Sequence, residues 1–146
     1  SRGLGDVYKR QTEGIKVMLD LADRDFEGLA FINLVDFDMV YGHRRNIDGY
    51  AAAATEFDQG LGEMLKKLRP DDLLIITADH GCDPGFTKTT DHTREYVPML
   101  AAGSCVKENN NLGTVLGFGA IGKTICSYLG VEAELAGQDL SERMFQ

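Results

Sequence analysis

Apolar residues recur every three or four positions along one long stretch of the chain. The stripe consists of Ile47, Tyr50, Ala51, Ala54, Phe57, Leu61, Met64, Leu65 and Leu68. Because this spacing places side chains on one face of a helix, it predicts a helix of about six turns that Pro70 stops. A shorter stripe of the same spacing predicts a helix over residues 12–23.

Three short apolar runs predict strands. They are Leu29–Val35, Leu73–Ala78 and Val97–Ala102. The first two are expected to be buried, and Pro98 favours an edge or a beginning for the third. A closing helix is expected over residues 120–129. The alternation of helix and strand, without an internal repeat or linker, indicates an α/β fold with a largely parallel sheet flanked by helices.

The first eleven residues, SRGLGDVYKRQ, stand outside this pattern. They show no hydrophobic periodicity and resemble translated sequencing-adaptor sequence. We therefore expect residues 1–11 to be a non-native tail and leave them out of the predicted fold. Residues 12–146 are expected to share one core, since their number is typical of a single domain.

Composition and charge narrow the function classes. The chain has 146 residues, of which 43% are hydrophobic and 26% charged, and its net charge of −8 argues against binding to nucleic acid or an anionic membrane. No apolar run reaches the roughly 20 residues of a membrane span. The three cysteines are widely spaced without a CxxC pair, which suits a reducing compartment. We therefore expect a cytoplasmic protein that has either an acidic surface or carboxylates that a metal cation neutralises.

Each of the three histidines lies in a loop that follows a predicted strand, and each has an aspartate nearby in the sequence. The pairs are Asp38 with His43, Asp79 with His80, and Asp91 with His92. A single pair of this kind is usually a surface loop or a hydrogen-bonded core histidine. Three pairs beyond the carboxyl ends of strands favour a metal site, because chemistry gathers there in parallel sheets.

The ligand types indicate which metals would bind. Carboxylate oxygen together with imidazole nitrogen suits Mn²⁺, Zn²⁺ or Fe²⁺, whereas Mg²⁺ and Ca²⁺ prefer oxygen alone. Five or more ligands exceed what one tetrahedral site requires. The sequence therefore predicts two metal ions that clamp the oxygens of a phosphoryl group.

Three longer segments surround these residues. They are Asn33–Asn46 (NLVDFDMVYGHRRN), Thr77–Pro84 (TADHGCDP) and Thr90–Pro98 (TDHTREYVP). Together they resemble the phosphopentomutase family of the alkaline phosphatase superfamily, and the resemblance runs from about Thr12 nearly to the end of the chain. Cofactor-independent phosphoglycerate mutases share ADHG but lack the VDFD…YGHRR and DHTREY strings.

The resemblance implies a fold and a set of metal ligands. The fold is the C-terminal portion of an alkaline-phosphatase-like core domain, over residues 12–146. The implied ligands are Asp38, His43 and His92 for one Mn²⁺, and Asp79 and His80 for a second. Asp36 alternates onto the same strand face but does not hold the family position. The stretch between Asp83 and Asp91 is one residue longer than expected, which leaves the path of the chain to His92 open.

The resemblance also implies an activity. In that family, α-D-ribose 1-phosphate and ribose 5-phosphate, or their deoxy equivalents, interconvert through a phosphothreonine and a bisphosphate intermediate. The family's threonine nucleophile, a further metal-binding aspartate and a capping domain precede the matching region. We therefore expect about the last third of an isomerase, inactive by itself. The alternative is another metal-dependent phosphohydrolase, or a phosphoglycerate-mutase-like enzyme, of the same superfamily.

Several side chains near the implied ligands are candidates for further roles. Arg44 and Arg45 could hold a substrate phosphate, or form a solvated pair or salt bridges instead. Arg94 and Glu95 could orient the neighbouring metal-binding loop. Cys82 is expected to be an inert thiol, because no third group is evident that would activate it.

The stretch Gly117–Thr124, GFGAIGKT, satisfies both the phosphate-loop pattern and the dinucleotide fingerprint. Either match would make the chain a nucleotide-binding module. However, the apolar run Thr114–Leu116 is too short for the strand that a phosphate loop follows, and no complete βαβ unit comes afterwards. We therefore expect a turn into the last helix rather than ATP or NAD binding, and a small pentose phosphate as the ligand of the protein.

Overall fold

The computed structural model describes residues 4–7 and 11–146 of the chain. It has two compact units, each made of two segments. The first unit contains Ser1–Leu68 and Ile75–Leu100, and the second contains Arg69–Leu74 and Ala101–Gln146. Among the helices that the structure describes, none combines the length and the apolar character needed to cross a bilayer.

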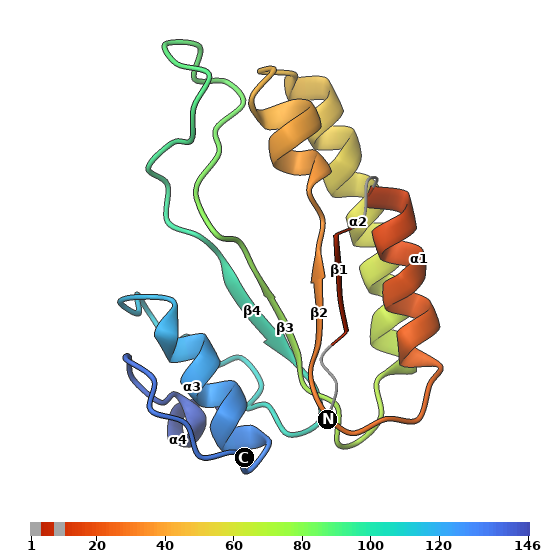
Figure 1. Cartoon of the computed structure of the whole chain (residues 1–146), viewed down its shortest axis with the longest axis vertical. Helices are drawn as coiled ribbons and strands as arrows, with labels where there is room; N and C mark the ends of the chain where they lie inside the picture. The colour runs from red at the N-terminus through yellow and green to blue at the C-terminus, as the bar shows by residue number, and fades with distance from the viewer. Residues whose placement is uncertain (1–3, 8–10) are drawn as a thin grey trace. The chain divides into compact units, whose positions relative to one another are not determined.

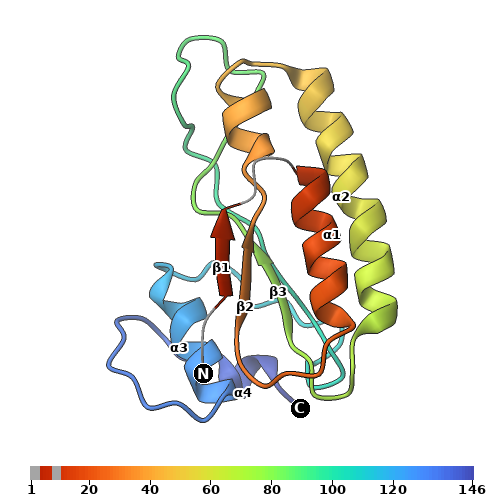
Figure 2. The same ribbon diagram turned by 45° about the vertical axis from the view of Figure 1, so that its right-hand side comes forward.

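The first unit begins with a parallel strand pair and two helices. Its elements are β1 (Leu4–Val7), α1 (Gln11–Ala22), β2 (Ala30–Asn33), the π-helical turn η1 (Phe37–Gly42) and α2 (Ile47–Lys67). β1 and β2 pair in parallel, so that α1 connects them as a crossover helix. Figures 1 and 2 both show α1 and α2 side by side on the same side of this pair.

Helix α2 confirms the long predicted helix almost to the residue. Asn46 caps its first turn by accepting a hydrogen bond from the Gly49 N–H at 2.9 Å. Its contact with α1 depends on Gly60, where an added Cβ would lie 2.5 Å from Cγ2 of the buried Ile15. The chain therefore leaves η1 through a well-defined helix start, which anchors the residues just before it.

The strands β3 (Leu74–Thr77) and β4 (Met99–Ala102) form a second pair. Figure 1 shows the chain running along β3, out through residues 78–98 and back along β4, and Gly81 and Thr93 form an antiparallel bridge between the two arms. The prediction of a largely parallel sheet is therefore wrong for this pair. Its physical reason is that residues 78–98, all of them described, contain no helix that could carry a parallel crossover.

Strand β1 lies inside the segment that the sequence pattern leaves out of the fold. The pattern predicts no element before Thr12, whereas the structure has β1 at Leu4–Val7 and begins α1 at Gln11. Residues 1–3 and 8–10 lie outside the described part of the chain. The non-native origin of the tail remains a prediction.

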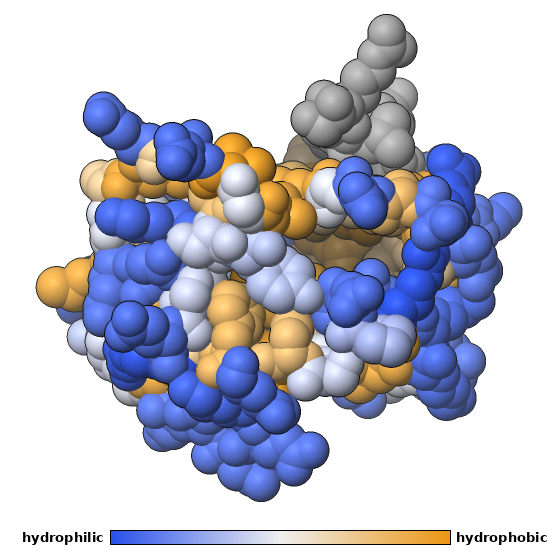
Figure 3. Space-filling view, turned by 90° about the horizontal axis from the view of Figure 1, so that it is seen from below, coloured by the Kyte–Doolittle hydropathy of each residue, from blue (hydrophilic) through white to orange (hydrophobic). Residues whose placement is uncertain are grey.

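The expected burial of the strand at Leu29–Val35 is also wrong. Phe31 is 67% exposed and Leu29 51% exposed, while Ala30 and Ile32 are half-buried toward the other face of β2. Other apolar side chains are exposed too, and Figure 3 shows hydrophobic areas between hydrophilic ones on the face that it presents. Among the described residues, the Phe31 side of β2 is thus largely exposed.

The second unit is built on α3 (Gly119–Tyr128) and the short α4 (Ser141–Met144). Thr124 is fully buried, donating a hydrogen bond to the Ala120 carbonyl at 2.8 Å and accepting one from the Leu140 N–H at 2.9 Å. Asp139 accepts hydrogen bonds from the hydroxyls of Ser127 and Ser141, and these bonds lower the pKa of its carboxyl to about 2. These contacts hold the segment before α4 against α3.

The GFGAIGKT stretch lies at the start of α3. An added Cβ on Gly119 would lie 1.8 Å from the Ala136 carbonyl oxygen, and one on Gly137 would lie 2.6 Å from the Ala120 N–H nitrogen. The backbone of residues 136–137 therefore packs directly on the first turn of the helix. Because the Thr124 hydroxyl is also used internally, these residues have a packing role, and no strand precedes them at 114–116.

Candidate metal centre

The turn η1 and the residue after it position Asp38 and His43, in a segment predicted to be a loop. Its hydrogen bonds span five residues: the His43 N–H donates to the Asp38 carbonyl and the Asn46 N–H to the Tyr41 carbonyl, each at 3.0 Å. Gly42 in this turn is buried, and a Cβ there would lie 2.5 Å from Cys82 Sγ. Because Gly42 has no side chain, the loop between β3 and β4 (residues 78–98) can pack against this turn, close to Asp38. Such π-helical turns are often found at functional sites.

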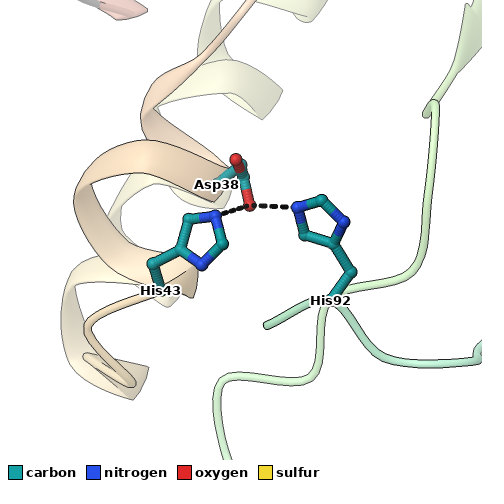
Figure 4. Close-up of side chains that lie close together, drawn as sticks. All are labelled: Asp38, His43 and His92. Atoms are coloured by element: carbon teal, nitrogen blue, oxygen red, sulfur yellow. Dashed lines mark ion pairs between the residues drawn. The ribbon is translucent and has the colours of Figure 1, made fainter. Parts of the chain in front are cut away.

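The β3–β4 loop, residues 78–98, brings His92 to the same place. Asp38 Oδ1 lies 3.3 Å from His43 Nε2 and 3.6 Å from His92 Nε2, and Figure 4 shows both rings directed at this oxygen. One donor atom from each of the three residues lies within 4.8 Å of the others. Residues that are five and 54 positions apart from Asp38 therefore meet at one carboxylate.

Backbone carbonyls fix the tautomers of two histidines. His43 Nδ1 lies 2.5 Å from the Thr90 carbonyl oxygen, and His80 Nδ1 lies 3.1 Å from that of Gly81. Since a carbonyl oxygen only accepts, each Nδ1 carries the proton in the neutral ring. Each Nε2 is then left with a lone pair, which is the form of imidazole that binds a metal.

His80 adjoins the three-residue group, whereas Asp79 lies outside it. The His80 ring stacks on the His92 ring with centroids 3.5 Å apart, and His80 Nε2 lies 4.0 Å from Asp38 Oδ1. The Asp79 side chain is 83% exposed, and its Oδ1 lies 3.6 Å from His80 Nε2. The structure thus gathers the ligands expected for the first metal. A second metal at Asp79 and His80 remains a prediction.

Asp38 Oδ1 is buried and has no hydrogen-bond partner among the described residues. With Nε2 of His43 unprotonated, a carboxylate oxygen and a nitrogen lone pair face each other, which is unfavourable unless a cation lies between them. Donor atoms bound to one first-row metal at about 2.0–2.2 Å are separated by about 3–4 Å. The oxygen–nitrogen separations around Asp38 fall in this range, so the site fits a divalent cation with mixed oxygen and nitrogen ligands.

Asp36 has a different role from Asp38, as the family position implied. Its Oδ2 accepts a hydrogen bond from the Gln11 N–H at 2.9 Å, at the start of α1. A carboxylate there stabilises the helix by satisfying a free N–H group and by opposing the helix dipole.

The four charged residues proposed for further roles, Arg44, Arg45, Arg94 and Glu95, differ in their contacts. Arg45 donates hydrogen bonds to three backbone carbonyls of the β3–β4 loop, a role that its sequence context does not predict. Arg44 and Arg94 are exposed. Glu95 accepts a hydrogen bond from the Thr93 hydroxyl, which in turn accepts one from the Asp83 N–H at 2.6 Å. These contacts support the orienting role expected of Glu95.

Cys82 lies beside Gly42 of the turn η1 as a half-buried thiol. Burial is the largest cause that raises its pKa above the ordinary value; Asp38 and Glu95 also raise it, whereas Arg45 acts in the opposite direction. Since the thiolate is the nucleophilic form, the raised pKa supports the expected inert thiol.

Comparison with a family model places the chain among known proteins. The model described as "Metalloenzyme: Metalloenzyme superfamily" matches residues 6–133, which include all the implied metal ligands. The match therefore covers most of the chain.

Three curated relatives carry the name phosphopentomutase. That of Acetivibrio thermocellus is 54% identical over 126 residues, covering 86% of this chain and 32% of the relative. That of Lachnoclostridium phytofermentans is 49% identical over 137 residues, with 93% and 35% covered. That of Carboxydothermus hydrogenoformans is 52% identical over 124 residues, with 85% and 32% covered. The chain thus spans about a third of the length of these relatives.

Proposed function

This chain belongs to the metalloenzyme superfamily, and from that premise we propose that it supplies the C-terminal third of a Mn²⁺-dependent phosphopentomutase. The enzyme interconverts (deoxy)ribose 1-phosphate and (deoxy)ribose 5-phosphate through a phosphothreonine and a bisphosphate intermediate. The observation that carries the proposal is the meeting of Asp38, His43 and His92 around one buried carboxylate oxygen. The similarity to phosphopentomutases over most of the chain supports it.

Each ligand has a defined part in this proposal. Asp38, His43 and His92 hold one cation, and Asp79 and His80 contribute to a second. Two such cations, when bound, offset the negative charge of a phosphoryl group during its transfer. The carbonyls of Thr90 and Gly81 keep the imidazoles of His43 and His80 in the ligating tautomer.

The remaining parts of the reaction are proposed to come from elsewhere. The threonine that carries the phosphoryl group and the cap over the substrate belong to the part of the enzyme that this chain does not span. Within the chain, the exposed Arg44 is left as the candidate for a substrate phosphate, since Arg45 binds backbone. The substrate is a small phosphosugar, and we extend the proposal to a cytoplasmic enzyme without nucleic-acid or membrane partners.

The proposal is tested with the full-length protein that carries this segment. With Mn²⁺, it is expected to convert α-D-ribose 1-phosphate to ribose 5-phosphate, as followed by ³¹P NMR, and EDTA should abolish the conversion. His92→Ala removes a ligand, so kcat/KM should fall by at least about 100-fold, because even losing a group that orients a ligand costs about 10- to 100-fold.

Lys123→Ala is the matched control, because Lys123 lies in the GFGAIGKT stretch, within the second unit, whereas the proposed metal ligands all belong to the first. It should keep the parent's activity. Release of inorganic phosphate without isomerisation would favour the phosphohydrolase alternative, and conversion that persists in EDTA would refute the metal-dependent mechanism.

A further inference from the structure

The side chain of Arg45 acts as a clamp on the β3–β4 loop. Its Nε donates to the Thr89 carbonyl at 2.8 Å, one terminal nitrogen to the Asp83 carbonyl at 3.0 Å, and the other to the Asp91 carbonyl at 2.5 Å. All three nitrogens of one guanidinium thus bind backbone within residues 83–91. We propose that Arg45 is a positioning residue that holds His92 and the Thr90 carbonyl in the geometry needed for metal binding.

The carbonyls that Arg45 binds lie next in sequence to two groups of the proposed metal site, the His92 ring and the Thr90 carbonyl. Asp91 directly precedes His92, whose Nε2 faces Asp38 Oδ1. Thr90, between the clamped residues Thr89 and Asp91, supplies the carbonyl that orients the His43 ring. Fixing this short stretch therefore sets one ligand directly and the tautomer of another.

The base of the clamp is itself held in place. Arg45 has φ +52°, a left-handed conformation that residues other than glycine adopt infrequently. Its N–H donates to the Gly42 carbonyl at 3.0 Å, and the next residue, Asn46, caps α2. Arg45 thus joins η1 to the start of α2 and directs its side chain at the β3–β4 loop. Residues with strained backbone conformations are often found at functional sites.

Only arginine can make this set of contacts. The guanidinium presents five N–H donors in a rigid planar fork, whereas a lysine ammonium is a point charge on a flexible stem. The positive charge of Arg45 and its hydrogen bonds to the loop have opposite effects on the affinity for Mn²⁺. As a positive charge, Arg45 would weaken cation binding, so removing the charge alone should strengthen Mn²⁺ binding, whereas loss of the clamp should weaken it.

The inference rests on the proposed metal site, and the experiment separates the two. In the full-length protein freed of metal, Mn²⁺ binding is titrated by the EPR signal of the free ion, and circular dichroism checks folding. The titration can show more than one Mn²⁺-binding phase, and the phase that His92→Ala weakens is the one that belongs to the Asp38 site. In that phase Arg45→Ala is expected to lose about 10- to 100-fold in affinity. Arg44→Ala removes a neighbouring positive charge without removing these contacts, so it should not weaken Mn²⁺ binding.

Arg45→Lys keeps the charge without the fork, and it gives the answer if Arg45→Ala does not fold. It should lose at least about tenfold in affinity. In a protein that already carries His92→Ala, adding Arg45→Ala should cost less than it does in the parent, because most of its effect passes through His92.

Four outcomes distinguish the possibilities. Parent-like affinity in both Arg45 variants, or an equal loss from Arg45→Ala in the two backgrounds, would overturn the positioning role and leave the metal site intact. A parent that does not bind Mn²⁺, or a His92→Ala variant that binds like the parent, would instead overturn the proposed function on which the inference rests.

Discussion

Replacing Asp38 by asparagine is expected to lower Mn²⁺ affinity by at least about 100-fold, the largest effect that we expect from a single substitution in the metal centre. The change removes the one anionic oxygen that faces both His43 and His92. It should not unfold the protein. In EDTA the melting temperature should equal or exceed that of the parent, because the orphaned Oδ1 of Asp38 no longer faces imidazole nitrogens as a buried charge.

Asp36→Asn is the matched control for this substitution. Asp36 lies two residues earlier and makes its hydrogen bond to the start of α1, so its charge acts on the metal only through a screened Coulomb interaction. Such a term is worth about 1 kcal/mol at most, or about a fivefold change in affinity. Titration of both variants with Mn²⁺ checks the prediction. Equal losses in the two variants would contradict the assignment of Asp38 as a ligand.

Replacing Gly119 by alanine is expected to lower the free energy of unfolding by about 2–3 kcal/mol, the largest stability effect expected in the second unit. The added Cβ would lie 1.8 Å from the Ala136 carbonyl oxygen and 2.9 Å from its carbon. Both atoms are backbone, so the segment before α4 would have to move away from the helix. Chemical denaturation followed by circular dichroism measures the loss.

Gly122→Ala in the same motif provides the comparison. A Cβ there would meet only the tip of the Leu135 side chain, at 3.4 Å. Since alanine is favoured over glycine inside a helix by about 1 kcal/mol, stability should be unchanged or increased. A phosphate-binding loop predicts another pattern, in which both substitutions abolish ATP binding and neither has a large effect on stability. That pattern would restore the nucleotide-binding hypothesis.

The sequence predicts which side chains meet at Asp38 better than it predicts the fold around them. The group formed by Asp38, His43 and His92 could be predicted because three aspartate–histidine pairs follow strands at once, whereas a single pair would not indicate a metal site. The structure brings these three residues together. The long helix could be found because its apolar stripe is continuous. In both cases the signal lies in the residues themselves.

The features that were missed depend on contacts between distant segments. The β3–β4 pair is antiparallel because its connection lacks a helix, a signal that is present in the sequence but outweighed by the general alternation of helix and strand. The π-helical turn at Phe37–Gly42 has no periodicity to reveal it over six residues. The clamp by Arg45 reaches carbonyls 38 to 46 positions away, and no local pattern records such contacts.

Anomalous diffraction at the manganese edge would show whether a metal ion binds at Asp38. Crystals of the full-length protein grown with Mn²⁺ should give an anomalous peak bounded by Asp38 Oδ1, His43 Nε2 and His92 Nε2. A fully occupied manganese elsewhere in the protein, with Asp38 still facing the two imidazoles and no peak between them, would show that these three residues do not form a manganese site.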